Sequence, residues 1–354
     1  MYLIIGLVLF IFILLLYYIV YSVKEVSFIR ELKINKYIKS LLIILILCLL
    51  LIFYNLVNFI IILIHLGFFI AISYLVLLLL SKVTKKKINM NNYKVLLGFI
   101  LTIVYLGIGT YLNYHVFETK YDIYTDKSLD LKILLISDSH IGTTFNGDGF
   151  YKEIEKLSKI DSDLVVIVGD YVDDDTKKTD MIKGTSSLSL LKPTYGVYFV
   201  FGNHDRGYSN YRDFNSNDLV NELIKNNVRV LVDEVVEFDN FYLIGREDRS
   251  KNRKSIDELV SNLDDKYKIV LNHQPNDYDN EKDKVDLVLS GHTHGGQLFP
   301  LGLVGMILGE NDLDYGIKTI GNTNFIVTSG ISDWSIQFKT GTKSEYVIIN
   351  IKSK

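Results

Sequence analysis

The sequence predicts an N-terminal membrane region of four helices, followed by a layered domain of the α/β or α+β class. Two observations support this. The polarity changes abruptly after about residue 113, because Leu, Ile, Phe and Tyr dominate before it and an ordinary globular mixture follows. Beyond residue 131, short apolar runs alternate with polar helical stretches, which is typical of sheets covered by helices. The 354 residues are enough for about two structural units.

The first 114 residues contain three long apolar stretches. Residues 1–22 carry no charge and can span a bilayer. They lack the basic start and the cleavage site of a signal peptide, so we expect a retained helix. Residues 41–80 are about 40 uncharged positions, roughly 60 Å as a helix, or about twice a hydrocarbon core. They form either one overlong helix or a hairpin that turns near Asn55 to Asn58. Residues 95–114 supply the last crossing.

Loop charge favours the hairpin. Residues 23–40 carry five basic side chains against two acidic ones, and residues 81–94 carry five basic side chains and no acidic one. The positive-inside rule places both loops in the cytoplasm. We therefore predict helices over 1–22, 41–56, 59–80 and 95–114, in a multi-pass protein of the cell membrane. The N-terminus and everything after Tyr114 would lie on the extracytoplasmic side.

The predicted crossings contain almost nothing ionisable apart from His65, which we interpret as a packed or interfacial residue. A transporter normally needs buried charges or interrupted helices along its path. The sequence therefore favours a membrane anchor for a catalytic domain over a transporter.

We expect a linker over 115–130 and one domain over 131–354. The expected strands are 131–137, 163–169, 196–202, 241–245, 267–272, 285–290, 324–329 and 345–351, and the expected helices are about 149–158, 178–191, 216–226 and 255–263.

Polar motifs end several of these strands. They are Asp138-Ser139-His140, Gly169-Asp170, Gly202-Asn203-His204-Asp205, His273, and Gly291-His292-Thr293-His294. Five of the seven histidines lie in them. Ligand sites in such folds collect at the carboxyl ends of strands. His292 and His294 are alternate residues and would face the same way. Oxygen and imidazole donors without thiolate suit Mn, Fe or Zn, so the motifs predict a metal site.

The ordered motifs "SDSHIG", "VGDYVD", "FGNHD", "LNHQP" and "GHTHGGQ" resemble the calcineurin-like metallophosphoesterase superfamily, and with the predicted helices they look most like its membrane-anchored bacterial phosphodiesterase branch. The resemblance covers roughly residues 131–350. It implies a layered αββα sandwich with two divalent metal ions, Mn being favoured over Fe or Zn.

The resemblance also implies roles for individual residues. Asp138, His140, Asp170 and His294 would hold one metal, and Asp170, Asn203, His273 and His292 the second, with Asp170 bridging. A hydroxide between the metals would attack phosphorus. His204 resembles the catalytic histidine that stabilises the transition state or protonates the leaving oxygen, and Asp205 would orient it. Gly169 and Gly202 would permit the turns that bring ligand atoms inward.

Other polar segments have less specific interpretations. We interpret Asp173 to Asp175 as a solvated loop or helix start rather than as ligands. Arg246 and Arg249 could meet a substrate phosphate, but exposed loop charge explains them equally well, so we exclude them from the site. We assign Gln297 no role. The apolar segment 298–308 could guide a lipid tail, although ordinary packing is slightly favoured.

We therefore expect a membrane-anchored phosphohydrolase acting on phosphodiester or pyrophosphate bonds, with a lipid-linked or envelope substrate compatible with the anchor. The alternatives are a phosphomonoesterase and a catalytically silent metal-binding sensory module. The net charge of −3 argues against a nucleic-acid partner. Cys48 is the only cysteine, so no intramolecular disulfide can form.

Overall fold

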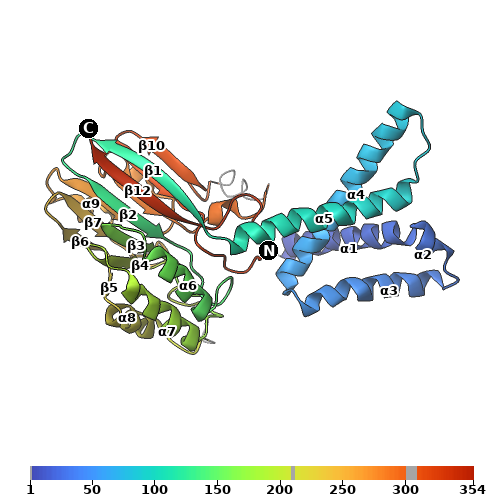
Figure 1. Cartoon of the computed structure of the whole chain (residues 1–354), viewed down its shortest axis with the longest axis horizontal. Helices are drawn as coiled ribbons and strands as arrows, with labels where there is room; N and C mark the ends of the chain where they lie inside the picture. Colours follow the sequence, from blue (N-terminus) through green and yellow to red (C-terminus); the bar gives the residue numbers. More distant parts are fainter. Residues whose placement is uncertain (1, 209–211, 300–308) are drawn as a thin grey trace. The chain divides into compact units, whose positions relative to one another are not determined.

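The computed structural model describes residues 2–208, 212–299 and 309–354, with side chains from residue 9 onward. The chain divides into two compact units, Met1–Thr110 and Tyr111–Lys354. Figure 1 shows the helical first unit and the mixed second unit, and each is described by itself.

The first unit is entirely helical. Its elements are α1 (Tyr2–Lys24), α2 (Ser27–Glu31), α3 (Lys36–Cys48), the 3₁₀ helix η1 (Leu49–Ile52), α4 (Leu56–Thr84) and α5 (Met90–Tyr114), whose last turn belongs to the second unit. Buried side chains that include Ile19, Leu47 and Leu63 pack α1, α3 and α4 together. Among the described residues, α4 and α5 are long and apolar enough to cross a membrane, and Leu9–Lys24 is a shorter apolar helix.

The predicted crossing over 41–56 differs from the structure. This segment is divided between the end of α3 and η1, and α3 has only 13 residues. An α-helix of that length is roughly 20 Å long, against about 30 Å for a hydrocarbon core. The expected turn is present, because the Asn55 side chain caps α4 by accepting a hydrogen bond from the Asn58 amide. Among the residues whose side chains are described, two membrane-length helices are therefore found where four crossings were predicted.

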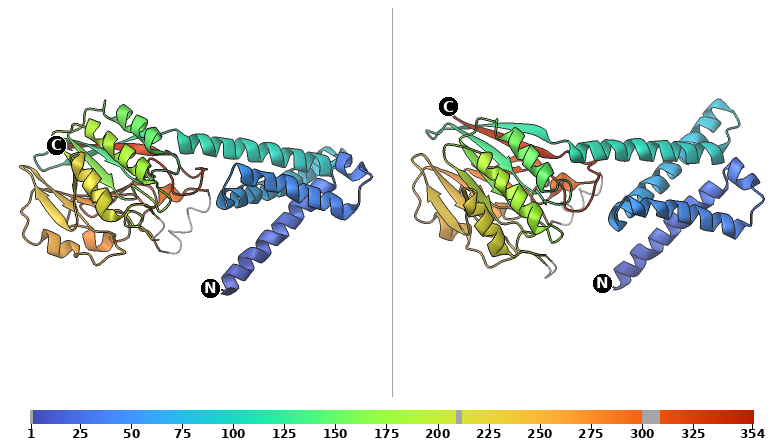
Figure 2. Two further views of the ribbon diagram at one scale, coloured as in Figure 1. Left: turned by 90° about the horizontal axis from the view of Figure 1, so that it is seen from below. Right: turned by 60° about the horizontal axis from the view of Figure 1, so that its bottom comes forward.

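Two six-stranded sheets form the second unit. The order in the first sheet is β1 (Phe117–Thr125), β12 (Glu345–Ser353), β2 (Leu131–Ile136), β3 (Leu164–Val168), β4 (Val197–Val200) and β5 (Val228–Val230). Strands β2 to β5 are parallel, and β12 is antiparallel to β2. One face is covered by α6 (Gly147–Leu157), α7 (Lys178–Ser187) and α8 (Ser216–Lys225), the green and olive helices of Figures 1 and 2.

The second sheet has the order β10 (Gly316–Ile320), β11 (Thr323–Val327), β9 (Leu287–Ser290), β8 (Tyr267–Leu271), β7 (Phe241–Gly245) and β6 (Glu234–Glu237). Strands β7, β8, β9 and β11 are parallel. The short helices α9 (Ile256–Val260) and α10 (Tyr278–Glu281) pack on one face through Ile256, Leu259 and Tyr278.

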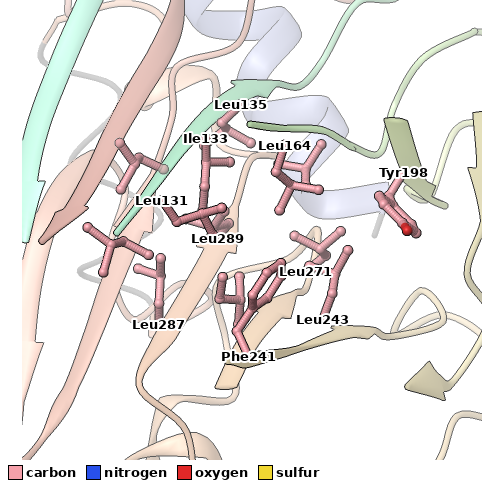
Figure 3. Close-up of a cluster of buried hydrophobic side chains, with 14 of the residues drawn as sticks. Leu131, Ile133, Leu135, Leu164, Tyr198, Phe241, Leu243, Leu271, Leu287 and Leu289 are labelled. Carbon is pink, nitrogen blue, oxygen red and sulfur yellow. The ribbon is translucent and has the colours of Figure 1, made fainter. Parts of the chain in front are cut away.

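The main core lies between the two sheets. Leu131, Ile133 and Leu135 of β2 point toward Leu287 and Leu289 of β9 in Figure 3, and all five side chains are buried. The uninterrupted apolar runs of these strands follow from burial on both faces, by helices on one side and by the other sheet on the other. The expected α/β layered domain is confirmed, with mixed sheets.

The predicted linker over 115–130 instead contains β1, which pairs with β12 along its whole length. Exposure alternates along most of β1, with Glu118, Lys120 and Asp122 pointing outward. This alternation is typical of a strand buried on one face only. The last turn of α5 is tied to the same region, because the Ser344 amide donates to the Leu112 carbonyl and the Ser344 hydroxyl donates to the Asn113 carbonyl.

Candidate metal centre

Parallel strands bring the polar motifs to one end of both sheets. Asp138, Asp170 and Asn203 follow β2, β3 and β4 of the first sheet. His273 follows β8 of the second sheet, and His292 and His294 follow β9. The carboxyl ends of the strands therefore supply Asp138, His140, Asp170 and Asn203 from the first sheet and three imidazoles from the second.

Three groups of donor atoms result, with the ligand atoms of each within 4.8 Å of one another. Asp138, His140 and His294 form the first group, and Asp170, His273 and His292 form the second. The third consists of His140, Asp173 and His204, so Asp173 lies among the candidate ligands although the sequence placed it in a solvated loop. Each of the first two groups takes residues from both sheets. The His292 amide, for example, donates to Asp138 Oδ1 at 2.9 Å. Both groups are therefore complete only when the two sheets are packed together.

Asp170 lies between the groups. Its Oδ2 atom is 3.1 Å from His273 Nε2 in one group and 3.7 Å from His140 Nε2 in the other. Its Oδ1 atom accepts a hydrogen bond of 2.9 Å from the His204 amide. The Asp170 carboxylate is buried, so it is oriented by these neighbours and faces both groups at once.

Asn203 lies beside the second group. Its Nδ2 atom donates to the Tyr208 hydroxyl at 2.7 Å. Its Oδ1 atom accepts from Gln274 Nε2 at 3.3 Å, and Gln274 is the residue after His273. The amide is therefore held with its oxygen toward the segment that carries His273.

Backbone strain is concentrated in this centre. Asp138, His140, Asp170, His292 and His294 have φ values of 54°, 36°, 51°, 75° and 49°. Left-handed backbone costs a non-glycine residue about 1–3 kcal/mol, and it clusters at functional sites. Gly202 has no room for a side chain, because an added Cβ would lie 2.2 Å from Asp170 Oδ1. The strained turns aim the side chains of both groups inward.

The carboxylate that contacts the His204 ring is Asp173, not Asp205 as the sequence led us to expect. His204 Nδ1 is 2.9 Å from Asp173 Oδ1. The other Asp173 oxygen is 3.2 Å from His140 Nδ1. Asp173 follows Asp170 by three residues in the same loop, and that proximity was the available signal.

Asp205 contacts backbone amides and has a structural role. It is fully buried, and its two oxygens accept hydrogen bonds from the amides of Asp170, Tyr171, Val172 and Gly202. Adjacency in the sequence suggested a bond to His204, but these four backbone donors surround Asp205 instead. It therefore holds the loop after β3 against the loop after β4.

The charges in the centre perturb one another strongly. Burial disfavours the ionised form of Asp170, but the imidazolium charges of His273, His140 and His204 hold its pKa well below the usual range. Burial also opposes charge on His204, but the hydrogen bond to Asp173 and the negative charges of Asp170, Asp173 and Asp205 together raise the pKa of His204 to about 9. By contrast, burial and the charge of His273 lower the pKa of His292 to about 4.

The donor set fits divalent cations. His140 Nε2 and His292 Nδ1 are buried nitrogens without a hydrogen-bond partner within the described part of the chain. Buried polar atoms are nearly always paired, so unpaired imidazole nitrogens beside two carboxylates need an explanation. Cations that take oxygen and nitrogen ligands would satisfy these atoms.

Several polar residues near the centre have other contacts. Arg246 is buried and ion-paired with Asp277 and Glu281, so it is not available to a phosphate. Arg249 lies in an exposed turn. Gln297 donates to the carbonyl of Phe338 at 2.9 Å. Most of the apolar segment 298–308 lies outside the described residues.

Two exposed aromatic residues flank His204. The Tyr208 ring centroid is 5.2 Å from that of His204, and the Trp334 centroid is 6.4 Å from it. Trp334 lies beyond β11, where its neighbour Asp333 contacts His294 Nδ1 at 3.1 Å. Neither Asp333 nor Trp334 was predicted from the sequence to belong to the site. The feature that could have identified them is the polar run around Gly330 after β11, because it resembles the polar motifs at the other strand ends.

Several known proteins are similar to this chain in sequence. The family model for calcineurin-like phosphoesterases matches residues 131–296. An uncharacterized metallophosphoesterase of Aquifex aeolicus is 33% identical over 266 residues, covering 71% of this chain and 98% of that protein. One from Campylobacter jejuni is 31% identical, covering 64% of this chain and 60% of that protein. A transmembrane protein with metallophosphoesterase domain from Danio rerio is 27% identical, covering 63% of this chain and 53% of that protein. By this similarity and by the motifs at its strand ends, the chain belongs to the calcineurin-like phosphoesterase family.

Proposed function

We propose that this chain is a membrane-anchored phosphohydrolase with a dinuclear metal centre, and that it cleaves phosphodiester or pyrophosphate bonds. The observation that carries the proposal is the position of Asp170, whose Oδ2 atom faces His140 of one donor group and His273 of the other. A carboxylate shared by two groups suits two cations that act on one substrate.

The chain would hold the two cations through the residues named by the family resemblance. Asp138, His140, Asp170 and His294 would bind one, and Asp170, Asn203, His273 and His292 the second. Bound divalent cations stabilise charge on phosphoryl oxygens and lower the pKa of coordinated water. A ligating imidazole must be neutral, so metal binding would displace the proton on His273, where burial opposes charge but the charge of Asp170 raises the pKa to about 10.

His204 and Asp173 are the candidates for proton transfer. An imidazolium at His204 gives its Nδ1 proton to the hydrogen bond with Asp173 Oδ1, and its Nε2 proton remains available to a leaving-group oxygen. The raised pKa of His204, about 9, keeps this ring protonated at neutral pH. Protonation of an alkoxide leaving group is typical general-acid catalysis.

The anchor is proposed from the helices and the loop charge. Helices α4 and α5 have the length and composition of membrane crossings. Loops 23–40 and 81–94 are basic, and the positive-inside rule favours a cytoplasmic position for both. The four-crossing topology, with the metal centre on the extracytoplasmic side, is part of the proposal. A lipid-linked or envelope substrate would suit that location.

The activity test uses the full-length protein in detergent. It is stripped with a chelator, supplied with Mn²⁺, and assayed on bis-p-nitrophenyl phosphate and p-nitrophenyl phosphate. We expect Mn²⁺-dependent cleavage of the diester that is lost in Asn203→Ala. Preference for the monoester would identify a phosphomonoesterase instead. Bound Mn²⁺ without turnover of any diester, pyrophosphate or monoester would favour a metal-binding sensory module.

A labelling experiment tests the topology. Cys48 is the only cysteine, so Cys48→Ser provides a cysteine-free background. Lys225→Cys lies on an exposed position of α8, and Lys87→Cys lies in the exposed basic loop before α5. An impermeant maleimide applied to intact cells should label Lys225→Cys and leave Lys87→Cys unlabelled. The reverse pattern would put the metal centre in the cytoplasm.

A further inference from the structure

A buried lysine and a buried aspartate lie behind one imidazole of the metal centre. Lys339 and Asp333 are both fully inaccessible to solvent, and Lys339 Nζ is 3.5 Å from Asp333 Oδ1. Both belong to the segment between β11 and β12. A lysine is almost never fully buried unless it is paired, so this pair requires a structural or functional reason.

The Lys339 ammonium is well satisfied by oxygen atoms. It donates to the Ser329 carbonyl at 2.8 Å, and to the Ser332 carbonyl and the Ser344 hydroxyl at 3.3 Å each. These contacts hold Nζ in place. Lys339 is thereby positioned as a cationic partner for Asp333, and a buried carboxylate without such a partner would be strongly disfavoured.

Asp333 makes its other contact with His294. Its Oδ1 atom is 3.1 Å from His294 Nδ1, and the Ser332 carbonyl is 3.3 Å from the same nitrogen. The Ser332 carbonyl is a hydrogen-bond acceptor at Nδ1, and the Asp333 carboxylate lies within ion-pair distance of the same atom, so both favour the tautomer with a proton there. His294 Nε2 then presents its lone pair on the side of Asp138, whose Oδ1 atom is 3.8 Å away.

The other imidazoles are supported differently. His273 Nδ1 contacts the carbonyl of Val168 at 2.8 Å, which is a neutral acceptor. His292 Nδ1 is one of the unpaired nitrogens that would face a cation, so it offers no comparable supporting contact. Asp173 contacts both His140, a candidate ligand, and His204, the candidate acid. Asp333 differs from Asp173 because the imidazole that it contacts is a candidate ligand alone.

We propose that Asp333, paired with the buried Lys339, is a positioning residue that fixes the tautomer and orientation of His294 and so sets the affinity of the Asp138/His140/His294 group for a divalent cation. The inference rests on the proposed metal centre, but it concerns binding and not turnover. Carboxylates that accept from the second nitrogen of a ligating histidine typically change metal affinity by about 10- to 100-fold.

The test measures Mn²⁺ binding to the full-length protein in detergent, by electron paramagnetic resonance of free Mn²⁺ in competition with a chelator. Asp333→Asn keeps the shape of the side chain and removes its charge. We expect one of the two bound ions to be weakened about 10- to 100-fold, with the other unchanged. The matched control is Glu345→Gln, another buried carboxylate, which contacts the Thr328 hydroxyl and the Ser329 amide and none of the candidate ligands.

A double variant separates positioning from stability. Asp333→Asn leaves Lys339 buried without a counter-charge, so its unfolding temperature should fall. Combining it with Lys339→Met removes both charges and should restore the unfolding temperature, while Mn²⁺ binding stays weak. The double variant also carries the test if Asp333→Asn alone does not fold.

The proposal is overturned if the double variant recovers Mn²⁺ affinity together with stability, because Asp333 would then act only through the fold. It is also overturned if Asp333→Asn binds both ions as tightly as Glu345→Gln does. A protein with no Mn²⁺ binding before substitution would instead contradict the proposed metal centre itself, so the two failures are distinguishable.

Discussion

The contact between Asp173 and His204 allows a quantitative test of the proposed general acid. Asp173→Asn removes the charge 2.9 Å from His204 Nδ1 and keeps a similar shape. If the pKa of His204 falls from about 9 to an ordinary value near 6.5, the protonated fraction at pH 8 falls from roughly 90% to roughly 3%. Cleavage that needs the Nε2 proton should therefore decrease about 30-fold at pH 8, and by less than about twofold at pH 6.

The direction of the pH effect follows from the proposed role of His204 as a general acid. Activity depends on protonated His204, so it is present at low pH and lost as the pH rises through the His204 pKa. The substitution should move this alkaline limb downward. The assay is kcat/KM between pH 5.5 and 9.5, with saturating Mn²⁺, on a diester with an alkyl leaving group. Bis-p-nitrophenyl phosphate is the control, because p-nitrophenolate leaves without a proton.

Two results would refute this reasoning. An alkaline limb at the same pH in both proteins would mean that Asp173 does not set the protonation of His204. An equal loss on the alkyl and aryl diesters at every pH would point to disturbed metal binding, because Asp173 also contacts His140. Mn²⁺ affinity of the variant is therefore measured alongside.

Three further predictions concern the metal centre and its surroundings. Asp205→Ala leaves four buried backbone amides without their acceptor, so we expect a loss of at least about 3 kcal/mol in folding free energy, seen as a lower unfolding temperature; a loss of kcat at unchanged stability would contradict this. Mn²⁺ added to chelator-stripped protein at about 100 times Kd should stabilise it by about 2.7 kcal/mol per site, and Asp170→Asn should abolish most of this effect in calorimetry. Trp334→Ala should raise KM for an aryl diester about fivefold, with Mn²⁺ affinity unchanged, because an aromatic contact contributes about 1 kcal/mol.

The central strands were predictable because the sandwich buries both of their faces. Strand β3 is buried at every position, and its apolar run "LVVIV" is visible without knowledge of its neighbours. The polar residues that follow such runs must then lie together at one end of the sheet. Strand β1 was not predicted, because it is an edge strand with one solvated face. That face carries Glu118, Lys120 and Asp122, and the resulting polar sequence resembles that of a linker.

The partners of the histidines were not predictable, because they depend on loop geometry and on closure of the sandwich. The left-handed backbone of Asp170 directs the following loop so that Asp173 reaches His204, while Asp205 turns toward backbone amides. Asp333 meets His294 from a segment 39 residues further along the chain, counted from 294 to 333. Neither pairing leaves a periodic pattern in the sequence.

The bonds of Ser344 to the last turn of α5 have a practical consequence for any soluble fragment. A fragment that begins at Leu131 would lose β1 and leave the edge of β12 unpaired, and exposed strand edges template aggregation. It would also remove Asn113, the acceptor of the Ser344 hydroxyl that in turn accepts from Lys339. Cutting at or before Tyr111 keeps both features. The boundary of the metal-binding unit therefore lies inside the final membrane-length helix, 26 residues ahead of Ser137, where the first sequence motif begins.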